Sequence, residues 1–402
     1  MMVIRSWLGR VVLLWGCFLV SWVYGQREYP VTFEVEVPFV LPSGVRVYIS
    51  GDHPRLGSWD PGLVNMHRVS PRRFRRTVWL PKGEVQFKFT LGSWRHVEKG
   101  VHWEELSNRR LKVVGRGSYF FRVARWNYSW DLRPVLPTWS GDIEAIANVY
   151  SPQLRNRRHI WVYLPPGYFT HLNRRYPVLY MHDGNNVFDA RRAFGGVEWS
   201  ADETAKRLLE AQKVVGFIIV AVSNTAKRMY EYTPVRDVRY GGGGGEKYAQ
   251  FLIKTLKPMI DRYYRTRPSR EYTAVMGSSL GGLVSLYLVW RHSEVFSQAG
   301  VVSPSVWWAR RWVVDFVGRY SPRYPVRIWL DMGTQEGGDR DRDGVSDALE
   351  DARLLRDVLL KRGMRYGKNF AYFEAVGARH NEYFWAKRLG RIFRFLYGKK
   401  KN

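Results

Sequence analysis

Cysteine is nearly absent from this sequence, which has one among 402 residues, Cys17. It lies in Val11–Gly25, an uncharged run that follows Arg5 and Arg10. A basic start, a short apolar run and a small residue at its end are typical of a secretory signal peptide, here cleaved before Gln26. The exported chain would then contain no cysteine. Disulfide bonds are thereby excluded, and burial of apolar side chains must stabilise a chain long enough for two domains.

A hydrophobic run long enough to cross a bilayer comfortably is also missing, because Val11–Gly25 is too short. We therefore predict a signal peptide over residues 1–25, a secreted or periplasmic protein, and no stable membrane insertion after cleavage. A lipid anchor on Cys17 is the alternative. It is disfavoured because Phe18–Val23 continues the apolar run instead of beginning a mature terminus.

Acidic residues are scarce beside basic ones, since 36 Asp and Glu against 64 Lys and Arg give a formal net charge of +28. The excess is spread along the chain, and the tail Lys399–Lys401 is only a short basic cluster. Nucleic-acid binders more often carry a basic stripe or a recognised motif, so we predict no nucleic-acid partner. An exported protein with such a surface suits anionic envelopes or acidic polysaccharides.

A Gly-x-Ser-x-Gly motif occupies residues 277–281, after the β-rich run Glu271–Val275 and before the helical pattern Leu280–His292. In an α/β-hydrolase such a strand-turn-helix exposes a nucleophilic serine, here Ser279. The two glycines are required because side chains there would collide with neighbouring backbone. The first N–H of the helix, at Leu280, is then available to hold an oxyanion. The alternative is a purely structural turn.

Two further residues of a catalytic triad are expected after the elbow, first an acid and then a histidine, each beyond a strand end. Glu336 follows the strand-like run Val326–Met332, and His380 follows the strand-like run Phe370–Val376. His380 would take the proton of Ser279 and later return it to the leaving group, while Glu336 orients the imidazole.

Few residues compete for these two roles. His380 is the only histidine after His292, so the alternative there is a surface histidine without a catalytic role. The acid has two competitors, Asp331 and Asp339, which flank Glu336 and either of which is within reach in sequence.

Residues 141–402 resemble the putative-esterase family of α/β-hydrolases, which includes feruloyl esterases, enterochelin esterases, S-formylglutathione hydrolases and mycolyltransferases. The matching segments are the elbow, YPVLYMHDGNNVFD (176–189), SPSVW (303–307), GTQE (333–336) and HNEYFW (380–385). The resemblance implies a mainly parallel sheet with helices on both faces, and Ser279, Glu336 and His380 as the triad. It also implies that the backbone N–H of Asn185 is the second oxyanion donor.

Residues 26–130 predict a small antiparallel β-sandwich, because apolar and polar positions alternate in short segments separated by proline and glycine turns. These segments are Val31–Val37, Val45–Ser50, Arg75–Leu80, Val85–Leu91 and Tyr119–Val123.

The same unit resembles a starch-binding domain of carbohydrate-binding module family twenty, in VYISGD (47–52), LGSWDP (56–61), LPKGEVQFKF (80–89) and WEELSNR (103–109). The resemblance implies that Trp59 and Trp103 stack on sugar rings and that Lys88 and Asn108 make polar contacts. A flat indole face suits the apolar C–H face of a sugar. Core tryptophans, or a unit that only packs on the hydrolase, are the alternatives. The insertion Thr90–Val101, with Trp94, departs from the family.

Residues 339–350 fit the EF-hand loop template, Asp-x-Asp-x-Asp-Gly followed by five residues and Glu. Oxygen ligands would come from Asp339, Asp341, Asp343, the Val345 carbonyl, Asp347 and Glu350. We predict a structural Ca²⁺ that stiffens the acid-bearing loop, and no cofactor for catalysis. The alternative is an acidic loop paired with Arg340 and Arg342.

Together these patterns predict an exported carboxylic ester hydrolase acting on carbohydrate-linked acyl or feruloyl esters through an acyl-Ser279 intermediate. A linker over residues 131–140 would join the two domains. Two alternatives remain: acyl transfer to a sugar hydroxyl, as in the mycolyltransferases, and a catalytically silent glycan-binding scaffold. A carbohydrate or carbohydrate ester is the expected partner in each case.

Overall fold

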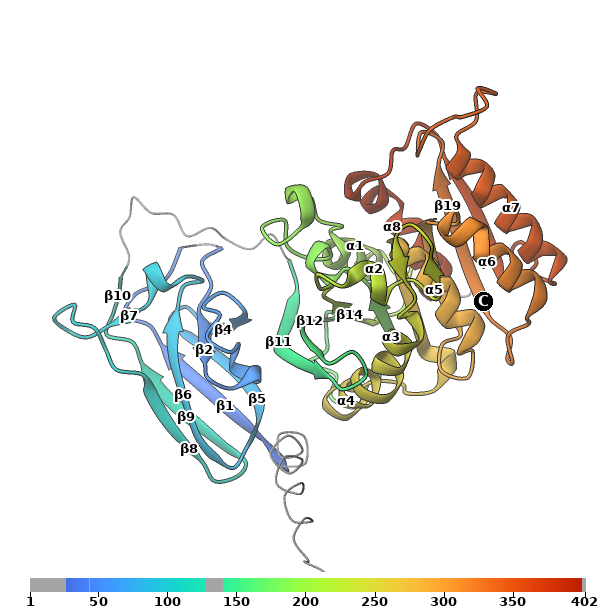
Figure 1. The fold of residues 1–402 in the computed structure, drawn as a ribbon. Helices are drawn as coiled ribbons and strands as arrows, with labels where there is room; N and C mark the ends of the chain where they lie inside the picture. The colour runs from blue at the N-terminus through green and yellow to red at the C-terminus, as the bar shows by residue number, and fades with distance from the viewer. Residues whose placement is uncertain (1–26, 43, 128–139, 400–402) are drawn as a thin grey trace, which may run out of the picture. The chain divides into compact units, whose positions relative to one another are not determined.

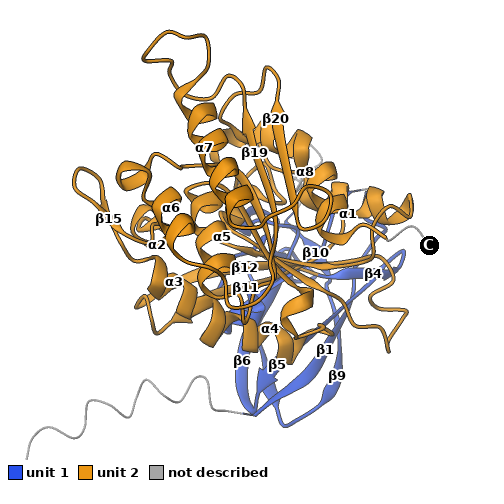
Figure 2. Cartoon of the chain, turned by 90° about the vertical axis from the view of Figure 1, so that its right-hand side faces the viewer, with its two compact units in different colours: residues 1–62, 66–134 blue, residues 63–65, 135–402 orange. Residues whose placement is uncertain are grey.

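The computed structural model describes residues 27–42, 44–127 and 140–399. The predicted signal peptide with Cys17, and residues 131–139 of the predicted linker, lie outside the described residues. The chain divides into two compact units, unit 1 being Met1–Gly62 with Met66–Pro134 and unit 2 being Leu63–Asn65 with Val135–Asn402 (Figure 2). In the described part of the chain, none of the helices combines the length and apolar character that a bilayer crossing requires.

Two four-stranded sheets, ordered β4-β5-β1-β9 and β3-β2-β6-β8, and a two-stranded sheet, β10-β7, are formed by strands that all belong to unit 1 except β3, whose residues fall in unit 2. Rings from both large sheets meet between them, since Phe33 lies 5.1 Å from Phe87 and Phe87 lies 5.2 Å from Phe121, centroid to centroid. The strands are β1 Glu28–Glu36, β2 Tyr48–Gly51, β3 Val64–Asn65, β4 His67–Ser70, β5 Arg73–Pro81, β6 Gly83–Thr90, β7 Glu98–Lys99, β8 Arg109–Val113, β9 Gly117–Arg122 and β10 Arg125–Trp126.

The predicted β-sandwich is confirmed, with one difference in strand direction. Strand β1 pairs with β5 antiparallel but with β9 parallel, Val31 lying opposite Gly117. Alternation of apolar and polar residues along a strand shows which face of that strand is buried. The alternation is the same whether the neighbouring strand runs parallel or antiparallel. Alternation therefore cannot predict a parallel neighbour.

Unit 2 is built on an eight-stranded sheet of order β11-β12-β14-β13-β17-β18-β19-β20 (Figure 1). The first two pairings are antiparallel, and every pairing from β14 to β20 is parallel. A short hairpin, β15-β16, lies outside it. The strands are β11 Asp142–Ser151, β12 Asn156–Leu164, β13 Val178–Met181, β14 Ile218–Val222, β15 Arg236–Asp237, β16 Gly241–Gly242, β17 Thr273–Ser279, β18 Gln298–Pro304, β19 Arg327–Gly333 and β20 Phe370–Ala375.

Helices cover both faces of this sheet, as predicted. The central strands β13 and β14 are buried along their whole length, which is the pattern of a sheet with no exposed face. On one face α3 to α7 contribute to a single apolar core. On the other α8 packs so closely that a Cβ on Gly300 would lie 3.3 Å from Ile392. The helices are α1 Ala201–Glu210, α2 Arg228–Glu231, α3 Gly245–Phe251, α4 Lys257–Tyr263, α5 Leu280–Arg291, α6 Trp308–Arg319, α7 Asp347–Lys361 and α8 Glu382–Tyr397.

Parallel strands bring distant segments of the chain to one edge of the sheet. Strands β13, β17, β18, β19 and β20 run in the same direction, so the segments that follow them begin at the same edge. In open α/β sheets this carboxyl edge is where ligands bind. Each residue predicted for the triad or the oxyanion hole ends one of these strands or follows it.

Candidate active site

The backbone at Ser279 adopts the strained geometry of a sharp turn between strand and helix, where the serine is half-buried. Ser279 ends β17 and precedes α5, with φ 57° and ψ −122°. Positive φ is unfavourable for a residue with a Cβ and persists only where the surrounding structure enforces it. Such strain is typical of functional positions.

Close packing around this turn requires glycine at two positions, one of which the motif did not single out. A Cβ on Gly277 would lie 2.9 Å from the backbone of Gly281, and a Cβ on Gly282 would lie 2.8 Å from the Val302 oxygen. At Gly281 the nearest atom would be a side-chain oxygen of Asp183, at 3.4 Å. The expectation of a backbone collision at Gly281 is therefore wrong, and Gly282 carries that constraint.

His380 and Glu336 are joined by a short hydrogen bond between His380 Nδ1 and Glu336 Oε2, at 2.6 Å. Glu336 is 1% exposed. Burial alone would raise the pKa of the Glu336 carboxyl, but hydrogen bonds from His380 and Ser303, with the charge of Arg388, hold that pKa below its usual value. Glu336 is therefore ionised and faces the imidazole as an anion.

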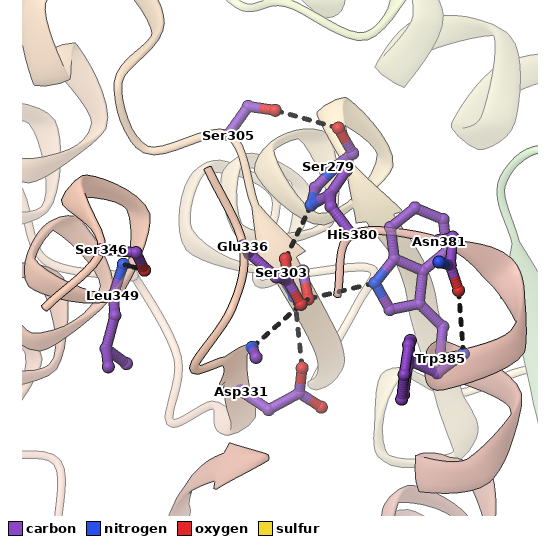
Figure 3. A network of polar contacts seen from close by, with 12 residues as sticks. Ser279, Ser303, Ser305, Asp331, Glu336, Ser346, Leu349, His380, Asn381 and Trp385 are labelled. Atoms are coloured by element: carbon purple, nitrogen blue, oxygen red, sulfur yellow. Dashed lines mark hydrogen bonds and ion pairs between the residues drawn. The ribbon is translucent and has the colours of Figure 1, made fainter. Parts of the chain in front are cut away.

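Ser279 Oγ pairs with Ser305 Oγ at 3.1 Å. No hydrogen bond joins Ser279 to His380 in the described part of the chain, and catalytic hydrogen bonds are often long before substrate binds. Ser305, His380 and Glu336 line one pocket of about 470 Å³. Figure 3 draws the His380 ring between Ser279 and Glu336.

The two competing acids do not contact His380. Asp331 is fully buried and accepts hydrogen bonds from Trp329 Nε1 at 2.7 Å and from Arg388 Nη1 at 2.9 Å. Asp339 lies on an exposed loop, where its carboxylate accepts from the Gly344 N–H at 3.0 Å. Glu336 therefore contacts the histidine, whereas Asp331 and Asp339 do not.

A buried polar network that the sequence analysis missed lies behind Glu336 (Figure 3). Ser303 Oγ donates to Glu336 Oε1 at 2.7 Å, and Trp385 Nε1 donates to Ser303 Oγ at 3.1 Å. Arg388, 3% exposed, reaches Asp331 at 2.9 Å and Glu336 at 3.3 Å. Burial raises the pKa of Asp331, while Arg388 opposes that shift. Each carboxylate is thus held by donors from other strands and helices.

The two predicted oxyanion donors lie at the ends of neighbouring strands. Leu280 is the first residue of α5, and Asn185 lies in the 3₁₀ turn Gly184–Asn186 that follows β13. The close approach of Gly281 to Asp183 brings these segments together. Asn185 Oδ1 accepts from the Asn224 N–H at 3.1 Å, which ties this turn to the segment that follows β14.

The four residues predicted for sugar binding lie in unit 1 and have different surroundings. Trp103 is 54% exposed, and the Arg125 guanidinium lies 5.2 Å from its ring. Lys88 Nζ donates to the Leu106 oxygen at 2.6 Å. Asn108 is exposed and donates through Nδ2 to Gln86 Oε1 at 3.2 Å.

Trp59 is half-buried and pairs with a tryptophan that the prediction did not include. Its ring lies 6.3 Å from that of Trp94, at 41°, and Trp94 is 43% exposed. The insertion that departs from the starch-binding family thus supplies a second aromatic ring beside the first.

Three of the predicted calcium ligands converge. Carboxylate oxygens of Asp339, Asp341 and Asp343 lie within 4.8 Å of one another, on an exposed loop. Gly344 has φ +89°, as the sharp turn of such a loop requires.

The other predicted ligands border this cluster. Asp347 begins α7 and pairs with Arg340 at 3.0 Å. Burial raises the pKa of Glu350, and the charges of Asp341 and Asp343 raise it further. Val345 lies between Asp343 and Asp347 in the loop, and its N–H donates to the Asp343 carboxylate at 2.8 Å.

Comparison with known families identifies unit 2. The model of the family described as "Putative esterase" matches residues 151–396, more than half of the chain. The chain belongs to this family. A second model, described as "Starch binding domain", matches residues 28–120. Both resemblances stated from the sequence are thereby confirmed.

Known relatives of the esterase family have modest identity to the chain. The uncharacterized protein YbbA of Bacillus subtilis is 22% identical over 252 residues, covering 61% of this chain and 94% of YbbA. The ferri-bacillibactin esterase BesA of Bacillus subtilis is 25% identical over 224 residues, covering 50% of this chain and 73% of BesA. The crystal structure of the BES protein from Bacillus cereus aligns with a TM-score of 0.52 and 21% identity over 68% of this chain and 100% of that one. The predicted α/β-hydrolase fold is confirmed.

Proposed function

We propose that this esterase-family protein is an exported serine hydrolase that cleaves acyl or feruloyl esters of carbohydrates. The observation that carries the proposal is the 2.6 Å hydrogen bond between His380 and the buried Glu336, beside a serine with φ 57° at a strand-to-helix turn. An ionised acid that orients a histidine next to a strained, accessible serine is the arrangement that acyl transfer needs.

In this proposal Ser279 Oγ attacks the ester carbonyl while its proton passes to His380 Nε2. The N–H groups of Leu280 and Asn185 hold the resulting oxyanion, and Glu336 stabilises the imidazolium. Collapse of the intermediate breaks the bond to the alcohol, which leaves with the proton from His380. Water then attacks the acyl-Ser279 ester by the same route, giving the acid and free Ser279.

The starch-binding domain supports a carbohydrate as the partner of unit 1. Exposed Trp103 and the Trp59–Trp94 pair offer flat aromatic faces, and Asn108 and Lys88 lie on the surface of the same unit or just below it. Stacking on such faces holds sugar rings without enclosing them. We propose that unit 1 keeps the enzyme on a glycan whose esters unit 2 cleaves. The basic excess of the chain, a formal net charge of +28 before the predicted signal peptide is removed, also suits an acidic polysaccharide.

The test of the esterase proposal is hydrolysis of p-nitrophenyl acetate by the wild type, Ser279→Ala and Ser278→Ala. Serine removal is expected to lower kcat by about 10⁴-fold or more, whereas the neighbouring Ser278, which is buried, is expected to matter little. A Ser279→Ala protein as active as the wild type contradicts the proposal. Product analysis with an added sugar acceptor separates hydrolysis from acyl transfer. Failure of the wild type to react with a serine-directed phosphonate would support a silent scaffold.

We also propose that the loop 339–350 holds a structural Ca²⁺. The three converging carboxylates and the Gly344 turn match the donor set and backbone that the ion takes in such loops. The ion would offset the repulsion among these acids and stiffen the segment that follows Glu336.

The test of the calcium proposal is luminescence of bound Tb³⁺ and the melting temperature of the full protein. At 100 times the dissociation constant, Ca²⁺ is expected to stabilise the fold by about 2.7 kcal/mol. Asp341→Asn is expected to weaken both signals, and Asp357→Asn, an exposed acid on α7, is the matched control. Equal Tb³⁺ binding by the two variants contradicts the site.

A further inference from the structure

The pocket beside His380 lies on one side of the candidate triad. It is lined by Glu336, His380 and Ser305, whose hydroxyl pairs with that of Ser279, while Ser279 itself, Leu280 and Asn185 do not line it. Asn185 instead borders a separate and much smaller hollow. In a serine esterase the histidine delivers its proton to the departing alcohol. A pocket on the histidine side, away from the oxyanion donors, therefore suits the alcohol half of the ester.

The pocket combines one aromatic platform with charged side chains. Trp307 is 46% exposed, and its ring is braced by Tyr240 at 5.5 Å and by the buried Trp308 at 5.6 Å, centroid to centroid. Bracing on two sides limits the rotamers of Trp307, so the indole is a fixed wall rather than a mobile side chain.

Besides Glu336 and His380, the charged side chains that line the pocket each belong to an ion pair. Arg340 Nε lies 3.0 Å from Asp347 Oδ2, and Arg311 Nε lies 2.5 Å from Asp351 Oδ1. Arg340, Asp347 and Asp351 line the pocket. Each ion pair engages one carboxylate oxygen of its aspartate. Acceptors and a guanidinium therefore surround the same volume that Trp307 borders.

This lining matches a sugar better than an aliphatic or aromatic acyl chain. Hydroxyl groups both donate and accept, so they can hydrogen-bond to carboxylates and to a guanidinium, while the C–H face of the ring stacks on the indole. An apolar chain in the same place would desolvate three charged groups without replacing their hydrogen bonds. The volume of about 470 Å³ lies within the ordinary range of small-molecule sites.

We infer that the pocket formed by Trp307, Arg340 and Asp351, and bordered by Asp347 of the proposed calcium loop, is the subsite for the sugar alcohol of the ester. The inference rests on the proposed esterase function and adds that the alcohol half of the ester lies in the pocket beside His380. It makes Trp307 and Arg340 specificity-determining residues for the alcohol, with the acyl group held on the opposite side of Ser279.

The experiment compares kcat/KM for two acetates, methyl 6-O-acetylglucoside and butyl acetate. Both give the same acetyl-enzyme, so their ratio reports only the alcohol half. The wild type is expected to prefer the sugar ester. Trp307→Ala is expected to lower the ratio about tenfold, since a lost stacking contact is worth about 1.4 kcal/mol. Arg340→Gln is expected to lower it about threefold, and because its side chain is 81% exposed, this variant tests the subsite without risk to the core.

The control is Phe169→Ala, an aromatic residue that is 49% exposed and lies between β12 and β13, away from the carboxyl edge of the sheet. It is expected to leave the ratio as in the wild type. Equal kcat/KM of the wild type for both acetates, or a ratio that Trp307→Ala and Arg340→Gln do not change, overturns the subsite and leaves the esterase function standing. If the wild type hydrolyses neither acetate nor p-nitrophenyl acetate, the esterase function itself fails, and the subsite fails with it.

Discussion

The candidate active site in unit 2 and the predicted sugar-binding residues in unit 1 hold their side chains by different means. Glu336 is 1% exposed and is held by His380, Ser303 and the Gly333 N–H, at 2.6 to 2.9 Å. Trp103 is 54% exposed, and the contact described for its ring is a guanidinium at 5.2 Å. One site is built from buried hydrogen bonds, and the other from exposed faces.

The difference suits the role that we propose for each site. Proton transfer tolerates little error in the distance between two atoms, so its residues need partners that lock their rotamers. Stacking on a sugar depends on area and orientation, which an exposed indole supplies with few supporting contacts. Substitutions in unit 2 are therefore expected to be costly, and those in unit 1 mild.

The largest expected effect is on catalysis, from Glu336→Gln. The amide cannot stabilise the imidazolium as an anion does, so kcat for p-nitrophenyl acetate is expected to fall by about 10³- to 10⁴-fold. Asp339→Asn, the competing acid three residues away on the exposed loop, is expected to lose far less activity, because it would act only through the proposed Ca²⁺ site. If Asp339→Asn lost more activity than Glu336→Gln, Asp339 and not Glu336 would be the acid of the triad.

Arg388→Met tests whether the buried network is as demanding as the comparison implies. The substitution leaves Asp331 and Glu336 without their shared cation, and the free energy of unfolding is expected to fall by about 3–5 kcal/mol. Without that cation the pKa of Glu336 should rise, because the charge of Arg388 helps to hold it low. The acid limb of the pH–rate profile should therefore also move to higher pH.

Two further variants separate positioning from a general loss of stability. Arg388→Lys should restore part of the stability and move the acid limb back. Arg394→Met, an exposed arginine on the same helix, should change neither quantity. Chemical denaturation and a pH–rate profile measure the two effects. An acid limb that stays in place in Arg388→Met would show that this residue does not position the acid.

His182 makes the stability of unit 2 dependent on pH. Burial lowers the pKa of this histidine to about 3. Between about pH 6.5 and about pH 3 the unfolded chain binds a proton there and the folded chain does not, so stability falls as the pH falls, by about 1.4 kcal/mol per pH unit. His182→Gln should flatten this slope, and His171→Gln, on the surface, should not. Urea denaturation at several pH values measures the slope of the unfolding free energy against pH. Equal slopes in the wild type and His182→Gln would exclude the effect.

The smallest effect is expected in unit 1, from Trp94→Ala. Because Trp94 lies 6.3 Å from Trp59, we expect the two rings to form one platform, whose loss weakens binding to soluble starch about tenfold. Hydrolysis of p-nitrophenyl acetate should not change. Phe120→Ala, 47% exposed on β9, is the control, measured by affinity electrophoresis. Equal retardation of Trp94→Ala and wild type would place sugar binding elsewhere.

Several elements of the molecule could be predicted from the sequence because they depend on local patterns. The runs predicted as Val326–Met332 and Phe370–Val376 are β19 and β20 within one residue at each end. The helical pattern Leu280–His292 is α5, to within one residue. Apolar periodicity and turn residues report on a few neighbouring positions, which is enough to locate such elements.

Other features could not be predicted because they depend on residues far apart in the chain. Arg388 is 57 residues from Asp331, and Trp385 is 82 residues from Ser303, yet both pairs are hydrogen-bonded. A buried arginine and a serine have no local signature that separates them from ordinary helix and strand residues. The same holds for Trp94, which is paired with Trp59 only after the insertion folds back.

The sequence by itself determined the family, the strand-turn-helix at Ser279, and the order of serine, acid and histidine. Only the tertiary structure decided that Glu336 contacts His380 while Asp331 is held by Arg388 and Trp329. The three acidic candidates lie within nine positions of one another, so sequence distance cannot rank them. The direction of β19 and the packing of α8 place one carboxylate at the imidazole and direct another into the core, and these are properties of the whole sheet.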